Sequence, residues 1–266
     1  MKITSLILLS FLFLLMAFLP FQVSANHSWG GYHWARTSNP FTLKLGDNVT
    51  SVWDAYLIEA SSDWSGSSVL DTTIVAGGTR AKNCRPTNGR MEVCNAKYGN
   101  NGWLGIAQIW IIGGTHITQA VAKMNDTYFS TLPYNTPAWK RLVMCQEIAH
   151  GFGLDHQDET FDNANLGTCM DYTSNPLGPP SNEHPNTHDY DMLMTIYEHL
   201  DTFTTINQVL STPSNGQAGN PAFLSELLDD PRQWGKRIRD NGRVAVFEKD
   251  FGHGNKVLTH VLWATE

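Results

Sequence analysis

The chain has 266 residues, of which 41% are hydrophobic and 16% charged, with 22 Gly, 12 Pro and a formal net charge of −7. This composition is typical of a globular protein and excludes collagen-like and Pro/Gly-rich disordered classes. Its acidic balance gives no electrostatic footprint for nucleic acid, so we expect no nucleic-acid partner.

The first 25 residues have the pattern of a secretory signal peptide. Lys2 precedes an apolar run over 6–19, and Pro20 and the small-residue sequence Val23-Ser24-Ala25 follow it. We therefore predict cleavage after Ala25 and a secreted, extracellular protein. An uncleaved membrane anchor is the weaker alternative, because the run is short for a bilayer. No later run is apolar enough to span a membrane, so we expect no stable membrane insertion.

Residues 41–76 predict a strand, a helix and a second strand. The sequence alternates over 41–45, and it turns strand-like again over 72–76. Between them Ser51 and Asp54 have the spacing of a capping box, and apolar residues from Trp53 to Trp64 follow at helical spacing.

A hairpin and a helix are predicted next. The strand-like runs 104–112 and 115–124 flank Gly113-Gly114. Thr136 then has the position of an N-cap, with Pro137 as the first helical residue. One face of that helix carries Trp139, Leu142, Val143, Gln146 and His150.

The C-terminal third predicts a further helix over 189–200, a Ser/Thr/Asn/Gly/Pro-rich stretch at 211–221, a short helix at 222–229, and a hairpin. The runs 244–249 and 256–263 form this hairpin. Strands come early and helices gather later, which favours an α+β fold. We expect a main domain over 26–201 and an extension over 202–266 that packs on it, since the extension is small for an independent domain.

The segment 145–156 contains residues suited to metal chemistry. Gln146 and His150 are four apart on a helix and can share one ion. Glu147 lies beside that ion, where it can take a proton from a bound water. Gly153 allows the chain to leave the helix sharply and bring His156 round as a third ligand. Met170 and Tyr172 follow after a short interval.

These residues resemble the metzincin zinc-protease signature H-E-x-x-H-x-x-G-x-x-H followed by a Met-turn. The resemblance implies an α+β catalytic domain with a twisted mixed sheet, an active-site helix and a C-terminal helix. It also implies a monomeric, secreted zinc endopeptidase that acts on peptide or protein substrates. Its Zn²⁺ ligands would be His150, His156 and Gln146, and Glu147 would be the general base.

The resemblance assigns further roles. Tyr172 would stabilise the oxyanion, and Met170 would form a structural floor under the metal. Residues 102–107 are similar to the matrixin edge strand. Leu104, Gly105, Ile106 and Ala107 would therefore bind an extended peptide by β-addition.

Gln146 stands where the family has its first zinc-binding His. It could reach the ion through its side-chain oxygen, or it could be a hydrogen-bonded residue in a weak or absent metal site. His116, His184 and His188 are possible substitutes. If the metal site is weak, the protein is a non-catalytic binding protein on the same scaffold. Ca²⁺ is a second possible cofactor, held by Asp155, Asp158, Glu159 and Asp162, although a solvated acidic loop is the simpler interpretation.

Four cysteines in an exported chain allow three connectivities. Cys84 and Cys94 flank a Gly/Pro/Asn/Arg-rich loop and suggest a short disulfide. Cys145 and Cys169 would then pair, and they lie close together if the motif folds as the resemblance implies. Four free thiols are the alternative, which is disfavoured outside the cytoplasm.

Overall fold

The structure is a computed structural model that describes residues 27–207 and 230–264. The predicted signal peptide and the predictions for 211–221 and 222–229 lie outside these described residues. Within the two described ranges, no helix combines the length and the hydrophobicity needed to cross a bilayer.

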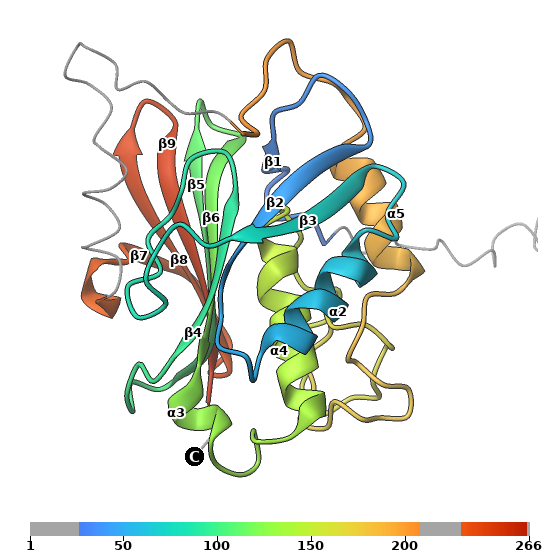
Figure 1. Cartoon of the computed structure of the whole chain (residues 1–266), viewed down its shortest axis with the longest axis vertical. Coiled ribbons are helices and arrows are strands. Elements are labelled where there is room, and N and C mark those ends of the chain that lie inside the picture. The colour runs from blue at the N-terminus through green and yellow to red at the C-terminus, as the bar shows by residue number, and fades with distance from the viewer. Residues whose placement is uncertain (1–26, 208–229, 265–266) are drawn as a thin grey trace, which may run out of the picture.

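A mixed sheet is the centre of the fold (Figure 1). The strands described are β1 (His33–Trp34), β2 (Phe41–Asn48), β3 (Leu70–Ala76), β4 (Met91–Ala96), β5 (Trp103–Ile112), β6 (His116–Asn125), β7 (Lys236–Asp240), β8 (Val244–Gly252) and β9 (Asn255–Trp263). Their order is β3-β2-β4-β6-β5-β9-β8-β7, and β1 pairs with the start of β6. Pairing is parallel from β3 to β6 and antiparallel from β6 to β7.

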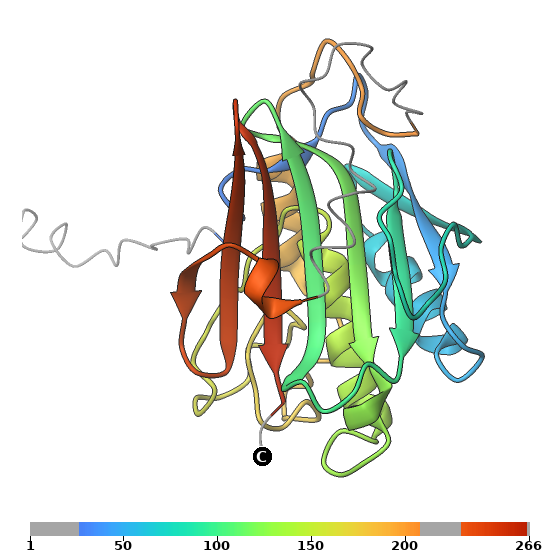
Figure 2. The ribbon, with the colours of Figure 1, turned by 90° about the vertical axis from the view of Figure 1, so that its left-hand side faces the viewer.

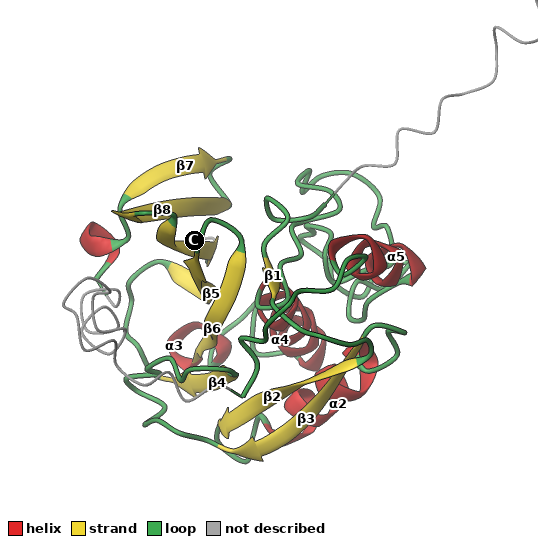
Figure 3. Cartoon of the chain, turned by 90° about the horizontal axis from the view of Figure 1, so that it is seen from above, coloured by secondary structure: helices red, strands yellow, loops and turns green. Residues whose placement is uncertain are grey.

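The helices are α2 (Asp54–Trp64), α3 (Asp126–Phe129), α4 (Pro137–His150) and α5 (Thr187–Ile196), and a 3-10 turn, η1, spans Pro231–Gln233. Helices α2, α4 and α5 lie on one side of the sheet, α3 lies at the end of β6, and η1 lies on the other side (Figures 1 and 2). Seen from the side, the sheet lies in front of α4, and seen from above it curves around α4 (Figures 2 and 3). The opposite face of the sheet has a smaller core that includes Cys84, Trp103, Trp110 and Trp234.

Several local predictions are confirmed. β5 and β6 form the predicted hairpin, and β8 and β9 form the C-terminal one. The second hairpin turns at His253 and Gly254, whose φ angles of 55° and 76° suit a tight two-residue turn. Thr136 caps α4 by accepting a hydrogen bond from the backbone N–H of Trp139, and Pro137 is the first helical residue.

Other local predictions are wrong. Ser51 forms no capping box, because α2 begins after Trp53 and has no side-chain cap. The C-terminal helix ends at Ile196 rather than at 200. Strands β4 and β7 were not predicted. The first five residues of β4 are all buried, including the polar Glu92 and Asn95, so burial along this strand does not follow the polarity of its residues.

Both predicted disulfides are present. Cys84 bonds to Cys94, and Cys145 bonds to Cys169. The second bond joins α4 to the segment that carries Met170, two chain regions that both border the site described next. Paired cysteines are also what an extracellular location favours.

Candidate metal centre

The C-terminal end of α4 and the turn after it bring His150 and His156 together. Gly153 has a φ of +94°, and a Cβ there would lie closer than 3.0 Å to the carbonyl oxygen of Tyr32. Only glycine fits this turn. The backbone N–H of Trp29 donates to the carbonyl of Gly153 at 2.7 Å and holds the turn against the N-terminal segment.

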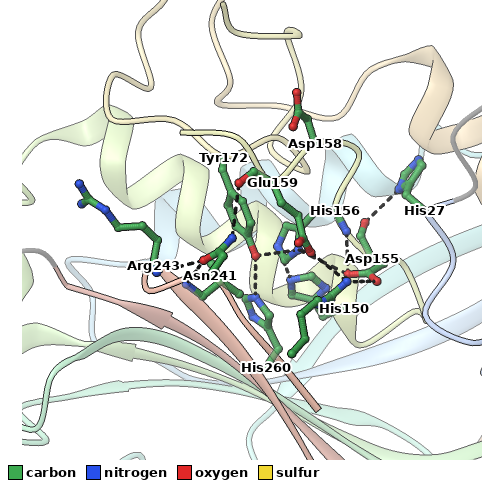
Figure 4. A network of polar contacts seen from close by, with 12 residues as sticks. His27, His150, Asp155, His156, Asp158, Glu159, Tyr172, Asn241, Arg243 and His260 are labelled. Atoms are coloured by element: carbon green, nitrogen blue, oxygen red, sulfur yellow. Dashed lines mark hydrogen bonds and ion pairs between the residues drawn. The ribbon is translucent and has the colours of Figure 1, made fainter. Parts of the chain in front are cut away.

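A third histidine, His260, completes a cluster with His150 and His156 (Figure 4). It comes from β9, where its neighbours across the sheet are Ala107 and Val246. The ligand atoms of the three rings lie within 4.8 Å of one another, and His150 Nε2 is 3.1 Å from His156 Nε2. Because side chains alternate along a strand, His260 points to the same face as Leu258 and Leu262, which is the face that α4 covers.

Each ring has its Nδ1 atom committed to another partner. His150 Nδ1 donates to the carbonyl of Leu154 at 2.8 Å. His156 Nδ1 lies 2.8 Å from the Tyr172 hydroxyl, and His260 Nδ1 lies 3.2 Å from Glu147 Oε2. This leaves the Nε2 atoms of His150 and His156 for a shared ion, whereas His260 Nε2 also lies 3.4 Å from the Tyr172 hydroxyl.

Burial keeps the cluster neutral. It lowers the pKa of His150 and His260 well below the usual value, and the neighbouring imidazoles lower both further. Burial also lowers the pKa of His156 to about 4. Neutral imidazole is the form that binds a metal.

Glu147 lies directly beside the cluster. It is fully buried, and burial raises its pKa well above the usual value. Its Oε1 atom has no hydrogen-bond partner. A Cβ at Gly105 of β5 would overlap this oxygen, so the carboxylate depends on glycine at that position. An unpartnered carboxylate oxygen beside three neutral imidazoles is suited to a bound ion or a water on it.

Gln146 belongs to an adjoining pocket. Its Nε2 donates to the carbonyl of Cys169 at 2.9 Å, and its Oε1 is buried without a partner. The pocket has a volume of about 250 Å³ and is lined by Leu104, Tyr134, Trp139, Leu142, Gln146, Tyr172, Leu262 and Trp263, among others.

The structure thus brings together His150, His156, Glu147 and Tyr172. It places the three suggested substitutes for Gln146 elsewhere. His116 lies near His33, His184 pairs with Asp63, and His188 stacks on His27. Sequence reasoning missed His260, because nothing near it in the chain links it to the motif at 147–156. Met170 is buried, and its carbonyl accepts from the N–H of Gln157 beside the His156 loop.

The prediction that Leu104, Gly105, Ile106 and Ala107 form an open edge is wrong. β9 pairs with β5 over this stretch, opposite Gly105, Ile106 and Ala107, and β6 pairs on the other side. The sheet therefore has no free main-chain groups there for a peptide strand. The C-terminal hairpin extends the sheet at this edge, and the apolar face of the hairpin is thereby buried in the main core.

The acidic loop binds an arginine. Arg239 of β7 forms two hydrogen bonds with Asp155, at 2.8 and 2.6 Å, and its Nη1 lies 2.8 Å from Glu159. Burial would raise the pKa of Asp155, but hydrogen bonds from His156 and Arg239 outweigh burial and hold it well below its usual value. Two of the four proposed calcium ligands, Asp155 and Glu159, thus form salt bridges to Arg239.

Arg239→Ala should lower the free energy of unfolding by about 2 kcal/mol, because it leaves Asp155 and Glu159 without their partner. The pair is partly exposed, which keeps the loss below that of a fully buried bridge. Zinc affinity should fall about tenfold, since Asp155 also accepts from the backbone N–H of His156. Urea denaturation and zinc titration measure both. Arg237→Ala on the same strand, at a more exposed side chain, should change neither.

Comparisons with known proteins give little sequence likeness. No family model and no curated protein matches the chain. Among solved structures, "Structure of myroilysin" is similar over 65% of this chain and 98% of that chain, with 12% sequence identity and a TM-score of 0.37. A likeness this low supports no function, so function has to be argued from the site itself.

Proposed function

We propose that the protein is a secreted, zinc-dependent peptidase whose metal ligands are His150, His156 and His260. The observation that carries this proposal is the convergence of three neutral imidazoles beside the buried Glu147 carboxylate. Three protein ligands with a further position left for water are the usual set in catalytic zinc sites.

The donor set fits zinc. Its three rings each offer a ring nitrogen within reach of one ion, and each Nδ1 atom has a neighbour that orients the ring. A bound Zn²⁺ would supply a lowered pKa for its water and polarisation of the scissile carbonyl.

Side chains of the protein would transfer the proton and stabilise the oxyanion. Glu147 Oε1, which has no partner, would take the proton of the attacking water and pass it to the leaving amine. Tyr172 would donate its hydroxyl to the oxyanion, because that hydroxyl lies between His156 and His260, at 2.8 and 3.4 Å. Gln146 would line the substrate pocket.

Substrate must approach by a route other than β-addition. β9 occupies the edge of β5 and also carries His260, so this strand cannot leave without taking a ligand away. We infer that a peptide enters through the pocket between Trp139, Tyr172 and Trp263. An apolar side chain of the substrate suits that pocket, and Leu104 is one of the residues that line it.

The test is cleavage of an unfolded protein by the full secreted chain in added zinc. Glu147→Gln should reduce the rate by at least about 10²-fold while the zinc content stays unchanged. Equal cleavage by both forms would contradict the assigned role of Glu147.

A second candidate is a metal-binding protein without hydrolytic activity. Burial of the site favours this candidate, because Glu147, His150 and His260 are all 0% exposed and a substrate has no direct access to them. Zinc bound at the cluster with no cleavage of any unfolded substrate would support this candidate and overturn the peptidase.

A further inference from the structure

A second group of ligand-type side chains lies away from the cluster just described. It contains His33 of β1, His116 at the start of β6 and Asp201 after α5, and His199 lies beside His33 and Asp201. His116 Nε2 is 3.2 Å from Asp201 Oδ1, and His33 Nε2 is 3.2 Å from His199 Nε2. His199 Nε2 lies 3.7 Å from Asp201 Oδ1, and His33 Nε2 lies 3.6 Å from Asp201 Oδ2.

Three of these separations are near the edge length of a zinc tetrahedron. Ligands held at about 2.0–2.1 Å in tetrahedral geometry are about 3.3 Å from one another. The His116–Asp201 Oδ1 and His33–His199 contacts are 3.2 Å, the His199–Asp201 Oδ1 contact is 3.7 Å, and each involves an Nε2 atom.

The surrounding groups orient two of the ligands. His33 Nδ1 donates to the carbonyl of Gly31 at 2.9 Å, so a neutral ring presents its Nε2 lone pair to the group. Asp201 Oδ2 accepts from the backbone N–H of Arg36 at 3.1 Å and from its guanidinium at 3.3 Å. Oδ1 is thereby turned toward His116 and His199.

We propose that His33, His116, His199 and Asp201 form a second zinc site, with a structural role. Four protein ligands leave no open position, which is the pattern of structural rather than catalytic zinc. The ion would join β1, β6 and the segment after α5, which are far apart in the chain. No residue is shared with the cluster of His150, His156 and His260.

A hydrogen-bonded network without metal is the competing explanation. In that network His199 would carry its proton on Nε2 and donate it to His33 Nε2, whose own proton is on Nδ1. The network also uses contacts of 3.6 and 3.7 Å, which are too long for hydrogen bonds.

The experiment is metal stoichiometry of the full secreted chain after zinc loading and desalting, measured by mass spectrometry. Unaltered protein should hold two zinc ions, whereas His116→Gln and His199→Gln should each hold one. His199 is 57% exposed, so its replacement should leave folding intact. His253→Gln, in the exposed turn between β8 and β9, is the matched control and should keep both ions.

Cobalt substitution gives a second readout. The visible absorption of tetrahedral Co²⁺ should fall by about half in His199→Gln. The proposal is overturned if His116→Gln and His199→Gln keep the full zinc content, or if the unaltered chain binds a single ion that His260→Ala abolishes. A chain that keeps one ion when His260 is replaced, and loses it when His199 is also replaced, supports this site even if the peptidase assignment fails.

Discussion

His260→Ala should abolish zinc binding at the cluster it shares with His150 and His156. Two imidazoles remain after the substitution, whereas a catalytic zinc site needs three protein ligands. We expect affinity at this cluster to fall by more than the roughly 10–100-fold that loss of an outer-shell partner costs. Peptidase activity should disappear with the metal. Competition with a chromophoric chelator measures the affinity directly.

Gln146→Ala is the matched control for this experiment. Gln146 lies one helical turn before His150 and donates to the carbonyl of Cys169, so its loss should leave zinc affinity within a few-fold of the original. Melting curves of both variants check that they fold. If Gln146→Ala lost the metal and His260→Ala kept it, the ligand would be at position 146, and the assignment of His260 would be wrong.

Gly153→Ala should destabilise the protein by about 3 kcal/mol or more and weaken zinc binding. A methyl group at a φ of +94° is strained, and here it would also collide with the Tyr32 carbonyl, which is backbone and cannot rotate away. Relief of the collision requires the turn to open, and the turn is what brings His156 toward His150. Denaturant unfolding and zinc titration report the two effects.

Gly99→Ala separates strain from collision. Gly99 has a φ of +99°, close to that of Gly153, but nothing lies within 4 Å of its Cβ position. That variant should lose only about 1–2 kcal/mol and keep its zinc affinity. Equal losses in the two variants would mean that the contact with Tyr32 plays no part.

Local signals in the sequence were sufficient for half of the candidate site. The Thr136-Pro137 start of α4 and the spacing of Glu147, His150, Gly153 and His156 all act over one or two turns of chain. Helix caps and glycine turns depend on neighbouring residues, so they can be recognised without knowledge of the fold. The same holds for the C-terminal hairpin, whose two strands and turn are contiguous.

The third ligand could not be found in this way. Glu147 and His260 are 113 positions apart, and their contact depends on which strand pairs with β5. Because residues 102–107 resemble the matrixin edge strand, the sequence predicts a peptide substrate, and not β9, at that edge. β9 pairs with β5 because this pairing buries the apolar face of the C-terminal hairpin. No short sequence pattern encodes that pairing.

Local patterns in the sequence therefore predicted the helix, the turn and two histidines of the candidate site, together with both disulfides. The pairing of strands over the whole sheet, which short patterns do not reveal, places β9 on the edge of β5, brings His260 to His150 and His156, and lets His33, His116, His199 and Asp201 meet. The two kinds of feature differ in how far apart the interacting residues are in the chain. Helix caps and turns depend on neighbouring residues, whereas strand pairing and the meeting of distant histidines depend on how the whole chain buries its apolar surface.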